Sequence, residues 1–295
     1  MAEAKGHKRN QKRRRESRYV RVARIAYAIA QEALPRYSHP KSPHIYTLPQ
    51  LAACVLLGFY LNISYRDLEE WLLATDRVLE VLELKRVPDH TTLYRAYRRL
   101  RMEDWERMRR VLLAKLGVEG KEEGIAIDST GFRLTQASAY YQSRTGRTYR
   151  EWIKGVYAVG TKTQLILAWR TGKGPGSDAP YLHGLKREIR RYGRQEGGKR
   201  AWLLLADSGF DGAAVEEGDL VPPIRRGGNL LAPKRRARAE LVDRARLDGI
   251  YGQRWKSETV QSVIKRKFGD TIRSRKRFLQ RREAAIKGLV YDLHR

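Results

Sequence analysis

Cysteine is almost absent from this 295-residue sequence, and no apolar run is long. The single cysteine, Cys54, lies in the segment LAACVLLGFYL. It has no partner for a disulfide or a zinc site, so we expect a core residue in a reducing compartment. The apolar segment is shorter than the ~20 residues that span a bilayer, and no apolar signal region follows the charged N-terminus. The sequence therefore predicts a soluble, cytoplasmic protein.

Acidic residues are scarce relative to basic ones. Asp and Glu number 33 against 61 Lys and Arg, which gives a formal net charge of +28 and a pI near 10.4. Nucleic acid is the leading partner for such a chain, and a nucleoid-associated location follows. An anionic membrane is a weaker candidate, because no long amphipathic helix separates a basic face from an apolar one. The basic residues concentrate in three patches, 1–24, 225–246 and 254–282.

The N-terminal part reads as a tail followed by helices. Residues 1–18 are basic and without periodicity, which predicts a disordered tail. Residues 19–118 predict an all-helical domain. Thr47 with Gln50, and Ser64 with Asp67, have the spacing of capping boxes that begin helices.

An arginine-rich helix near the end of this region is the candidate DNA-binding element. Asp89 or Thr91 would begin it. A short series of helices ending in an arginine-rich one is typical of a helix-turn-helix reader, but a plain bundle with a solvated basic face fits equally well. The arginines in question are Arg95, Arg98, Arg99 and Arg101.

Residues 119–295 predict a second domain of α/β type. Strands are expected in GIAIDST, IKGVYAVG, QLILAWRTG and AWLLLADSGF, and helices over 180–192, 237–267 and 279–293. Strands followed by helices in this order predict a mixed sheet flanked by helices.

Two aspartates, Asp128 and Asp207, each stand at the predicted C-terminal end of an apolar strand. Acids delivered from neighbouring strands repel each other unless a cation lies between them, and Mg²⁺ prefers such oxygen ligands. Glu258, inside the long basic helix, is the candidate third carboxylate of a two-metal site for displacement at phosphorus. Each acid also has an ordinary alternative: the aspartates can cap turns, and Glu258 can pair with a neighbouring Lys or Arg.

The segment YGQRWKSETVQSVIK resembles a known transposase motif. Its Tyr251, Arg254, Glu258 and Lys265 match the Tyr-x2-Arg-x3-Glu-x6-Lys pattern of insertion-sequence DDE transposases, families four and five in particular. IAIDST and LLADSGFD are similar to the first and second Asp motifs of those transposases, and residues 64–100 look like the N-terminal region of family-five-like members.

This resemblance implies a ribonuclease-H-like, retroviral-integrase-like catalytic domain. Asp128 would lie on its first strand, Asp207 after its fourth and Glu258 on the following helix, with Mg²⁺ as cofactor and Mn²⁺ able to substitute. Glu258 follows Asp207 by only 51 residues, so the large β insertion of some relatives should be missing. The resemblance also implies DNA ends and target DNA as substrates, and a homodimer on DNA.

Physical chemistry suggests roles around Glu258. Tyr251, Arg254, Glu258 and Lys265 fall close to one helical face. Arg254 can grip a phosphate with two nitrogens, and Lys265 can act as a point charge. The basic residues Arg266 and Lys267 extend the candidate DNA contact. Trp255 is either a stacking platform for an unpaired base or an ordinary core residue.

These features predict a DNA transposase that cuts at the ends of its element and joins the 3′-hydroxyls to target DNA. A nuclease or junction resolvase of the same fold would use the same acids without strand transfer. A domesticated DNA-binding protein would gain nothing from three carboxylates among phosphate contacts. An RNA-binding protein is a weaker alternative still, because the sequence has no aromatic RNA-reading motif.

Overall fold

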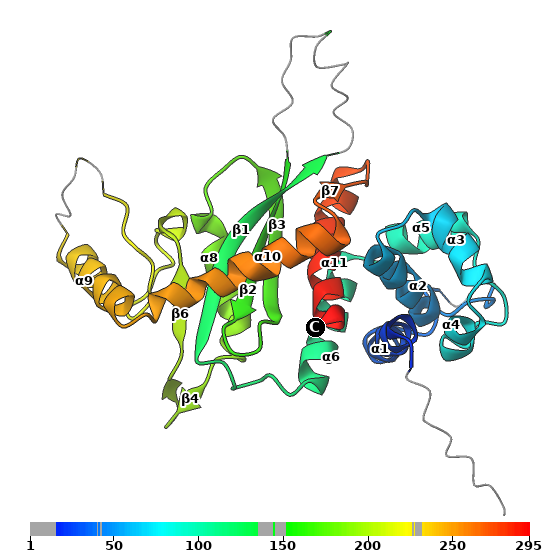
Figure 1. Cartoon of the computed structure of the whole chain (residues 1–295), viewed down its shortest axis with the longest axis horizontal. Coiled ribbons are helices and arrows are strands. Elements are labelled where there is room, and N and C mark those ends of the chain that lie inside the picture. The colour runs from blue at the N-terminus through cyan, green and yellow to red at the C-terminus, as the bar shows by residue number, and fades with distance from the viewer. Residues whose placement is uncertain are drawn as a thin grey trace, which may run out of the picture.

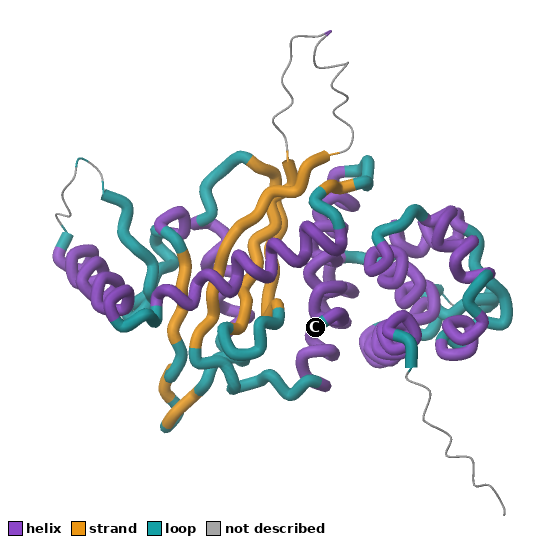
Figure 2. Tube along the Cα trace, in the orientation of Figure 1, coloured by secondary structure: helices purple, strands orange, loops and turns teal. Residues whose placement is uncertain are grey.

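The computed structural model describes residues 16–39, 41, 43–134, 144, 152–225, 227 and 232–295. They form a helical part that leads into a mixed α/β part (Figure 1). Figure 2 shows the strands gathered in the second part and the helices of the first packed beside it. Most of the predicted tail 1–18 lies outside the described residues, and Arg18 already belongs to the first helix.

Two helices of the helical part begin at the capping boxes that the sequence predicts. The Thr47 hydroxyl accepts from the backbone N–H of Gln50 at 3.3 Å, while the Gln50 side chain accepts from Thr47 N at 2.8 Å. Ser64 and Asp67 form the second predicted capping box. The helices are α1 (Arg18–Ala33), α2 (Leu48–Leu61), α3 (Tyr65–Leu73), α4 (Asp76–Val81), α5 (His90–Arg99) and α6 (Met102–Lys115).

Helix α2 is apolar on nearly all sides and is buried accordingly. Cys54, in its middle, is fully buried and free, as expected for a core residue, and burial raises the pKa of its thiol to about 12. No single helix in the described ranges is long and apolar enough to cross a membrane. Only α2 and α3 taken together meet that criterion, and they are bent by 105° where they meet.

The second part contains a five-stranded mixed sheet. Its main path runs β3-β2-β1-β6, with β1 antiparallel to β2 and parallel to β6, and β7 pairs with the far end of β1. A separate hairpin joins β4 (Gln195–Glu196) and β5 (Lys199–Arg200). The strands of the main sheet are β1 (Gly124–Leu134), β2 (Trp152–Gly160), β3 (Ile166–Gly174), β6 (Leu203–Ala206) and β7 (Thr271–Ile272).

Helices cover both faces of this sheet. One face, which includes Ile127 and Ala206, packs against α8 (Ala179–Ile189). The other face, which includes Phe132, packs against α10 (Trp255–Phe268) and α11 (Arg277–His294). Figure 1 shows α10 crossing the strands on this second face. The layered order helix–sheet–helix makes the second part a mixed α/β structure.

Helix α11 connects the two parts. The Tyr157 hydroxyl of β2 donates to the Ala284 carbonyl at 2.6 Å, and the Tyr97 hydroxyl of α5 donates to the Leu279 carbonyl at 2.8 Å. Side chains from the helical part, from α10 and α11 and from the sheet share one apolar core. The predicted boundary between domains 19–118 and 119–295 remains a prediction, because this core runs across it.

Three details differ from the sequence-based expectation. Strand β1 does not end at Asp128 but continues to Leu134, because its antiparallel partner β2 pairs with it as far as Trp152. The helix expected over 237–267 is broken into α9 (Pro233–Leu247), the 3₁₀ turn η2 (Tyr251–Arg254) and α10, with Gly249 in a left-handed conformation at φ 71°. Arg101 is not on the arginine-rich helix but begins α6.

The expected lack of a β insertion agrees with the structure. In the described residues between Asp207 and Glu258, the regular elements are the 3₁₀ turns η1 (Ser208–Phe210) and η2, and helix α9. Among these described residues, strand pairing is limited to an isolated parallel bridge between Leu220 and Leu205 of β6.

Candidate active site on the face covered by α10

Asp128 and Asp207 lie next to each other on one face of the sheet. The parallel register pairs Ile127 with Ala206, so the following residue of each segment is an aspartate at an equivalent position. Ile127 and Ala206 pack toward α8, and side chains alternate along extended chain. The backbone of Asp207 is extended, so both carboxylates project to the opposite face, which α10 covers.

Asp128 is held in an environment that disfavours a bare negative charge. Its side chain is 14% exposed, and it accepts a hydrogen bond from the backbone N–H of Ser129 at 2.9 Å. Burial, above all, raises the pKa of the Asp128 carboxyl to about 6, and the carboxylates of Asp207 and Glu258 add to this effect, while Ser129 and Arg254 oppose it. A proton or a cation is therefore favoured at this position.

The raised pKa predicts that Asp128→Asn stabilises the metal-free protein. A folded-state pKa above the ordinary value of 3.8 means that the native state binds the proton more tightly, so the carboxyl increasingly destabilises the fold as pH rises from 3.8 to about 6, and by a constant amount above that. The displacement corresponds to roughly 3 kcal/mol of unfolding free energy near neutral pH. Urea unfolding with a chelator present should show this gain, shrinking to nothing below about pH 4. An Asn variant equally stable or less stable at neutral pH would contradict the inference.

Asp207 combines a capping role with its place in the site. Its side chain accepts from the backbone N–H of Gly209 at 3.0 Å and so begins the turn η1. The hydroxyl of Tyr251 donates to the carbonyl of Ala206, the preceding residue, at 3.0 Å. Burial raises the pKa of Tyr251, and the nearby Asp207 carboxylate contributes to that rise. The tyrosine thus attaches η2 to the strand end that carries Asp207.

Arg254 and Glu258 complete the cluster from α10 and the turn before it. The Arg254 guanidinium lies 2.6 Å from a Glu258 oxygen and 3.9 Å from an Asp128 oxygen. Glu258 is about half exposed, whereas Arg254 is a quarter exposed. The ordinary role considered for Glu258, an ion pair, is therefore present, and the same arginine ties it to the first aspartate.

One contact joins the start of α10 to the end of β2, and a second lies within the start of the helix itself. Lys256 donates to the carbonyl of Thr161, just beyond β2, at 2.8 Å. The buried Ser257 hydroxyl donates to the Arg254 carbonyl at 2.8 Å. Both contacts lie within one turn of Glu258, so the first holds its segment near the end of β2 and the second stabilises the start of its helix.

The donor set has the chemistry of a Mg²⁺ site. Asp128, Asp207 and Glu258 offer carboxylate oxygens, which Mg²⁺ and Mn²⁺ take as ligands, and the neighbouring carboxylates contribute to the raised pKa of Asp128. Within the described part of the chain, no three His, Cys, Asp or Glu side chains converge closely enough to hold a metal ion as they stand. Arg254 supplies the positive charge between Asp128 and Glu258, so a cation would replace it at those oxygens.

The other residues predicted around the motif are distributed along α10. Trp255 is 52% exposed, so it is not a core residue, and its ring is free to stack. Lys265 and Arg266 lie in the last turns of the helix, beyond Glu258. The ammonium of Lys267 turns inward to the ring of His294, 2.9 Å from Nε2, and lies over the ring of Tyr60. DNA contact by Lys265, Arg266 and Lys267 stays a prediction.

The arginines of α5 lie apart from this cluster, in the helical part (Figure 1). Arg95, Arg98 and Arg99 are all exposed. Arg98 packs over the ring of Tyr94, 5.8 Å from its centroid, and Arg99 donates to the Ser38 hydroxyl at 2.8 Å. The exposed position of these arginines fits a helix-turn-helix that contacts DNA and a plain bundle with a solvated basic face equally well, so both stay predictions.

A fourth carboxylate, Asp178, was not anticipated from the sequence. It precedes α8 in the segment Ser-Asp-Ala-Pro, which is typical of a helix N-cap, yet its side chain makes no capping bond. Instead it accepts from the Ser129 hydroxyl at 2.7 Å and from the buried ammonium of Lys154. A Cβ on Gly209 would lie 3.6 Å from an Asp178 oxygen and 3.1 Å from an Asp207 oxygen. Asp178 therefore lies behind the site, with its charge balanced by Lys154.

Comparison with known proteins gives one family. A family model described as a transposase DDE domain matches residues 119–293, more than half of the chain. A search of curated proteins gives no match. The matched range contains Asp128, Asp207 and Glu258 and begins at the predicted start of the second domain.

Proposed function

Because the chain belongs to the transposase DDE domain family, we propose that it is a DNA transposase that cuts at the ends of its own insertion sequence and joins the 3′-hydroxyls to target DNA. One observation carries the proposal. The parallel register of β1 and β6 brings Asp128 and Asp207 together on the face covered by α10, which carries Glu258 in its first turn and directly follows Arg254.

In the proposed reaction, each residue of this face has its own role. Water attacks a phosphodiester at the element's end and releases a 3′-hydroxyl, which then attacks a phosphodiester of target DNA and displaces the target's own 3′-oxygen. Asp128, Asp207 and Glu258 would hold Mg²⁺, for which Mn²⁺ substitutes, and a bound ion of this type supplies Lewis-acid chemistry at phosphorus. No covalent bond between protein and DNA is needed.

Arg254 and Tyr251 position the DNA in this proposal. Arg254 pairs with Glu258 at 2.6 Å, and if a cation were bound at Glu258, the guanidinium would be available to grip a phosphate with two nitrogens. Tyr251 remains fixed to the Ala206 carbonyl and keeps that arginine near Asp207. Trp255, exposed beside them, can stack on an unpaired base at the cut.

The strand order supports a ribonuclease-H-like assignment for the sheet. Three strands, β1 to β3, form an antiparallel meander, and β6 returns parallel to β1 after a helix. The first carboxylate lies on the first strand and the second follows the fourth strand of this sheet. The net charge of +28 supports DNA as the partner, and we propose residues 19–118 as a DNA-binding domain and a homodimer as the unit that joins two ends.

The test is a cleavage assay on the DNA that flanks the protein's own gene. The purified protein is incubated with a labelled fragment and Mg²⁺ or Mn²⁺, beside an Asp207→Asn variant. We expect metal-dependent cuts at defined ends with the wild type and none with the variant. Cuts without transfer to a second DNA would indicate a nuclease or resolvase. Tight binding without cuts under either metal would indicate a DNA-binding protein without transposase activity.

A further inference from the structure

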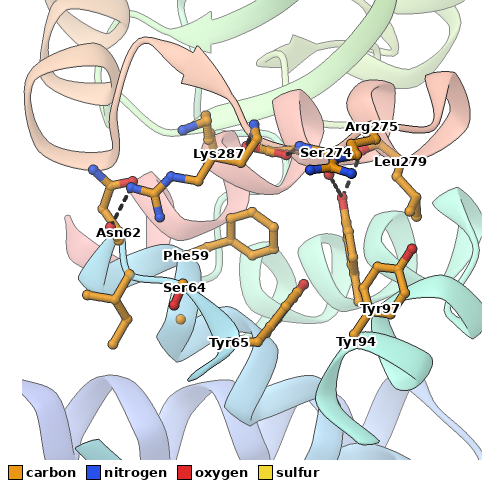
Figure 3. A pocket seen from close by; sticks show the side chains of 14 residues that line it. Phe59, Asn62, Ser64, Tyr65, Tyr94, Tyr97, Ser274, Arg275, Leu279 and Lys287 are labelled. Atoms are coloured by element: carbon orange, nitrogen blue, oxygen red, sulfur yellow. Dashed lines mark hydrogen bonds between the residues drawn. The ribbon is translucent and has the colours of Figure 1, made fainter. Parts of the chain in front are cut away.

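A cavity of about 360 Å³ separates the helical part from the segment that leads into α11. Figure 3 shows the rings of Phe59, Tyr65, Tyr94 and Tyr97 on one side, and Ser274, Arg275 and Lys287 on the other. None of these residues belongs to the carboxylate site described above. The volume falls within the range of ligand-binding pockets, ~300–1,000 Å³, and is far too small to admit a double helix.

Aromatic side chains from three helices form one wall of this cavity. Phe59 of α2 and Tyr97 of α5 meet edge to face, with ring centroids 5.5 Å apart. Tyr65 of α3 lies 6.2 Å from Tyr97 and 6.3 Å from Tyr94. Tyr94 is 38% exposed, so its ring is open to a planar ligand, and Arg98 packs over it from outside.

The opposite wall is basic, and buried hydrogen bonds hold its backbone in place. Glu283, almost fully buried, accepts from the backbone N–H groups of Arg273 and Ser274 at 2.9 Å each. The buried Lys287 donates to the carbonyls of Phe268 and Gly269, which end α10. The one carboxylate of the cavity is therefore occupied by backbone donors, and the segment keeps its shape without a ligand.

Two arginines belong to this wall. Arg273 reaches across to the Asn62 carbonyl at 2.8 Å and so joins the two walls. Arg275 is exposed, and its side chain forms no hydrogen bond or ion pair with the described residues. A free guanidinium above an aromatic cavity suits a phosphate attached to a planar group.

A second hollow continues the cavity along the surface. It shares Ser64, Tyr65 and Tyr94 with the first and is bordered by three exposed or half-exposed arginines. Basic side chains thus stand at both ends of the aromatic wall, which is where the backbone of a nucleic acid strand would enter and leave. These arginines are Arg66, Arg95 and Arg98.

We propose that this cavity binds an unpaired nucleotide of the DNA, with its base against Tyr65 and Tyr94 and its phosphates on Arg275 and on Arg95 and Arg98. The proposal rests on DNA as the substrate, and it adds to it a preference for DNA that contains an unpaired nucleotide. Aromatic stacking with flanking cations is the general means by which single-stranded nucleic acid is held. It also gives the arginines of α5 a contact that needs no base-pair reading in a groove.

The test compares the Kd for a duplex carrying one unpaired nucleotide with the Kd for the same duplex fully paired. We expect the full-length wild type to bind the unpaired form about tenfold more tightly. Tyr94→Ala and, separately, Arg275→Ala should each remove most of this preference and leave the Kd for the paired duplex nearly unchanged. Phe278→Ala is the matched control, because Phe278 is similarly exposed and stacks with Arg282 at 4.9 Å but lies outside the cavity.

The outcomes separate this proposal from the one on which it rests. A wild type that binds both duplexes equally, or a Tyr94→Ala variant that keeps the preference, overturns the nucleotide site while DNA binding stands. Loss of the preference in Phe278→Ala also overturns it, since the effect would then not belong to this cavity. A wild type that binds neither duplex overturns both proposals.

Discussion

Glu258→Gln should lower the rate of metal-dependent DNA cleavage by at least about 1,000-fold. A carboxylate that holds a catalytic metal contributes several kcal/mol to the transition state, and ~4 kcal/mol corresponds to three orders of magnitude. Gln has nearly the shape of Glu but cannot supply the negative charge that the metal requires. Glu258 is about half exposed, so the fold should tolerate the change.

Two controls separate this effect from damage to folding or DNA binding. Glu217→Gln makes the same chemical change at an exposed position of the loop after β6, and it should cut normally. Gel-shift binding of the element's ends by Glu258→Gln should stay within a few-fold of the wild type, because the arginines and lysines that attract DNA are unchanged. Cleavage at the normal rate by Glu258→Gln would show that the carboxylate triad is wrongly assigned.

Arg254 explains how the metal-free site tolerates its own charges. Three carboxylates would repel one another on this face, yet the guanidinium contacts both Asp128 and Glu258. The same side chain is then available for phosphate once a cation takes over its place. One arginine can therefore stabilise the resting site and position the substrate at different stages.

Much of the fold was predictable because it depends on local signals. The capping boxes of Thr47 and Ser64 begin α2 and α3 as expected, since a cap is decided by residues three positions apart. The apolar runs before Asp128 and Asp207 are strands, because buried strands need continuous apolar residues. The DDE family was recognisable for a related reason: the predicted motif around Glu258 is a fixed spacing along one segment, and the family model matches the range that contains it.

What escaped prediction depends on contacts between distant segments. Asp178 reads as a helix cap, and only the fold brings it to Ser129 and Lys154. The end of β1 is set by its partner β2, not by its own residues. The cavity beside Arg275 has walls from helices more than 170 residues apart in the chain, such as those carrying Tyr97 and Leu279, which are 182 residues apart. Periodicity along a single segment holds no information about such a site.

A buried ion pair between α6 and α8 should contribute strongly to the stability of the fold. Arg109 of α6 is fully buried, donates to the Leu167 carbonyl and to Glu188 of α8, and stacks on the ring of Trp169 at 4.8 Å. Removing one partner of such a pair leaves an uncompensated buried charge. We therefore expect Glu188→Leu to lower the free energy of unfolding by about 3 kcal/mol, measured by urea unfolding.

The double variant Arg109→Met with Glu188→Leu shows why the pair is there. Replacing both charges by apolar groups of similar size removes the fully buried cation. Arg170, which also pairs with Glu188 at 2.9 Å, is 29% exposed and keeps contact with water, so most of the lost stability should return. Glu32→Leu breaks an exposed pair with Lys115, in which both side chains are about half exposed, and it should cost less than about 1 kcal/mol. If the double variant is as unstable as Glu188→Leu alone, the cost arises from packing rather than from charge. If it recovers its stability and still cuts DNA, the pair serves the fold and has no part in the cleavage reaction.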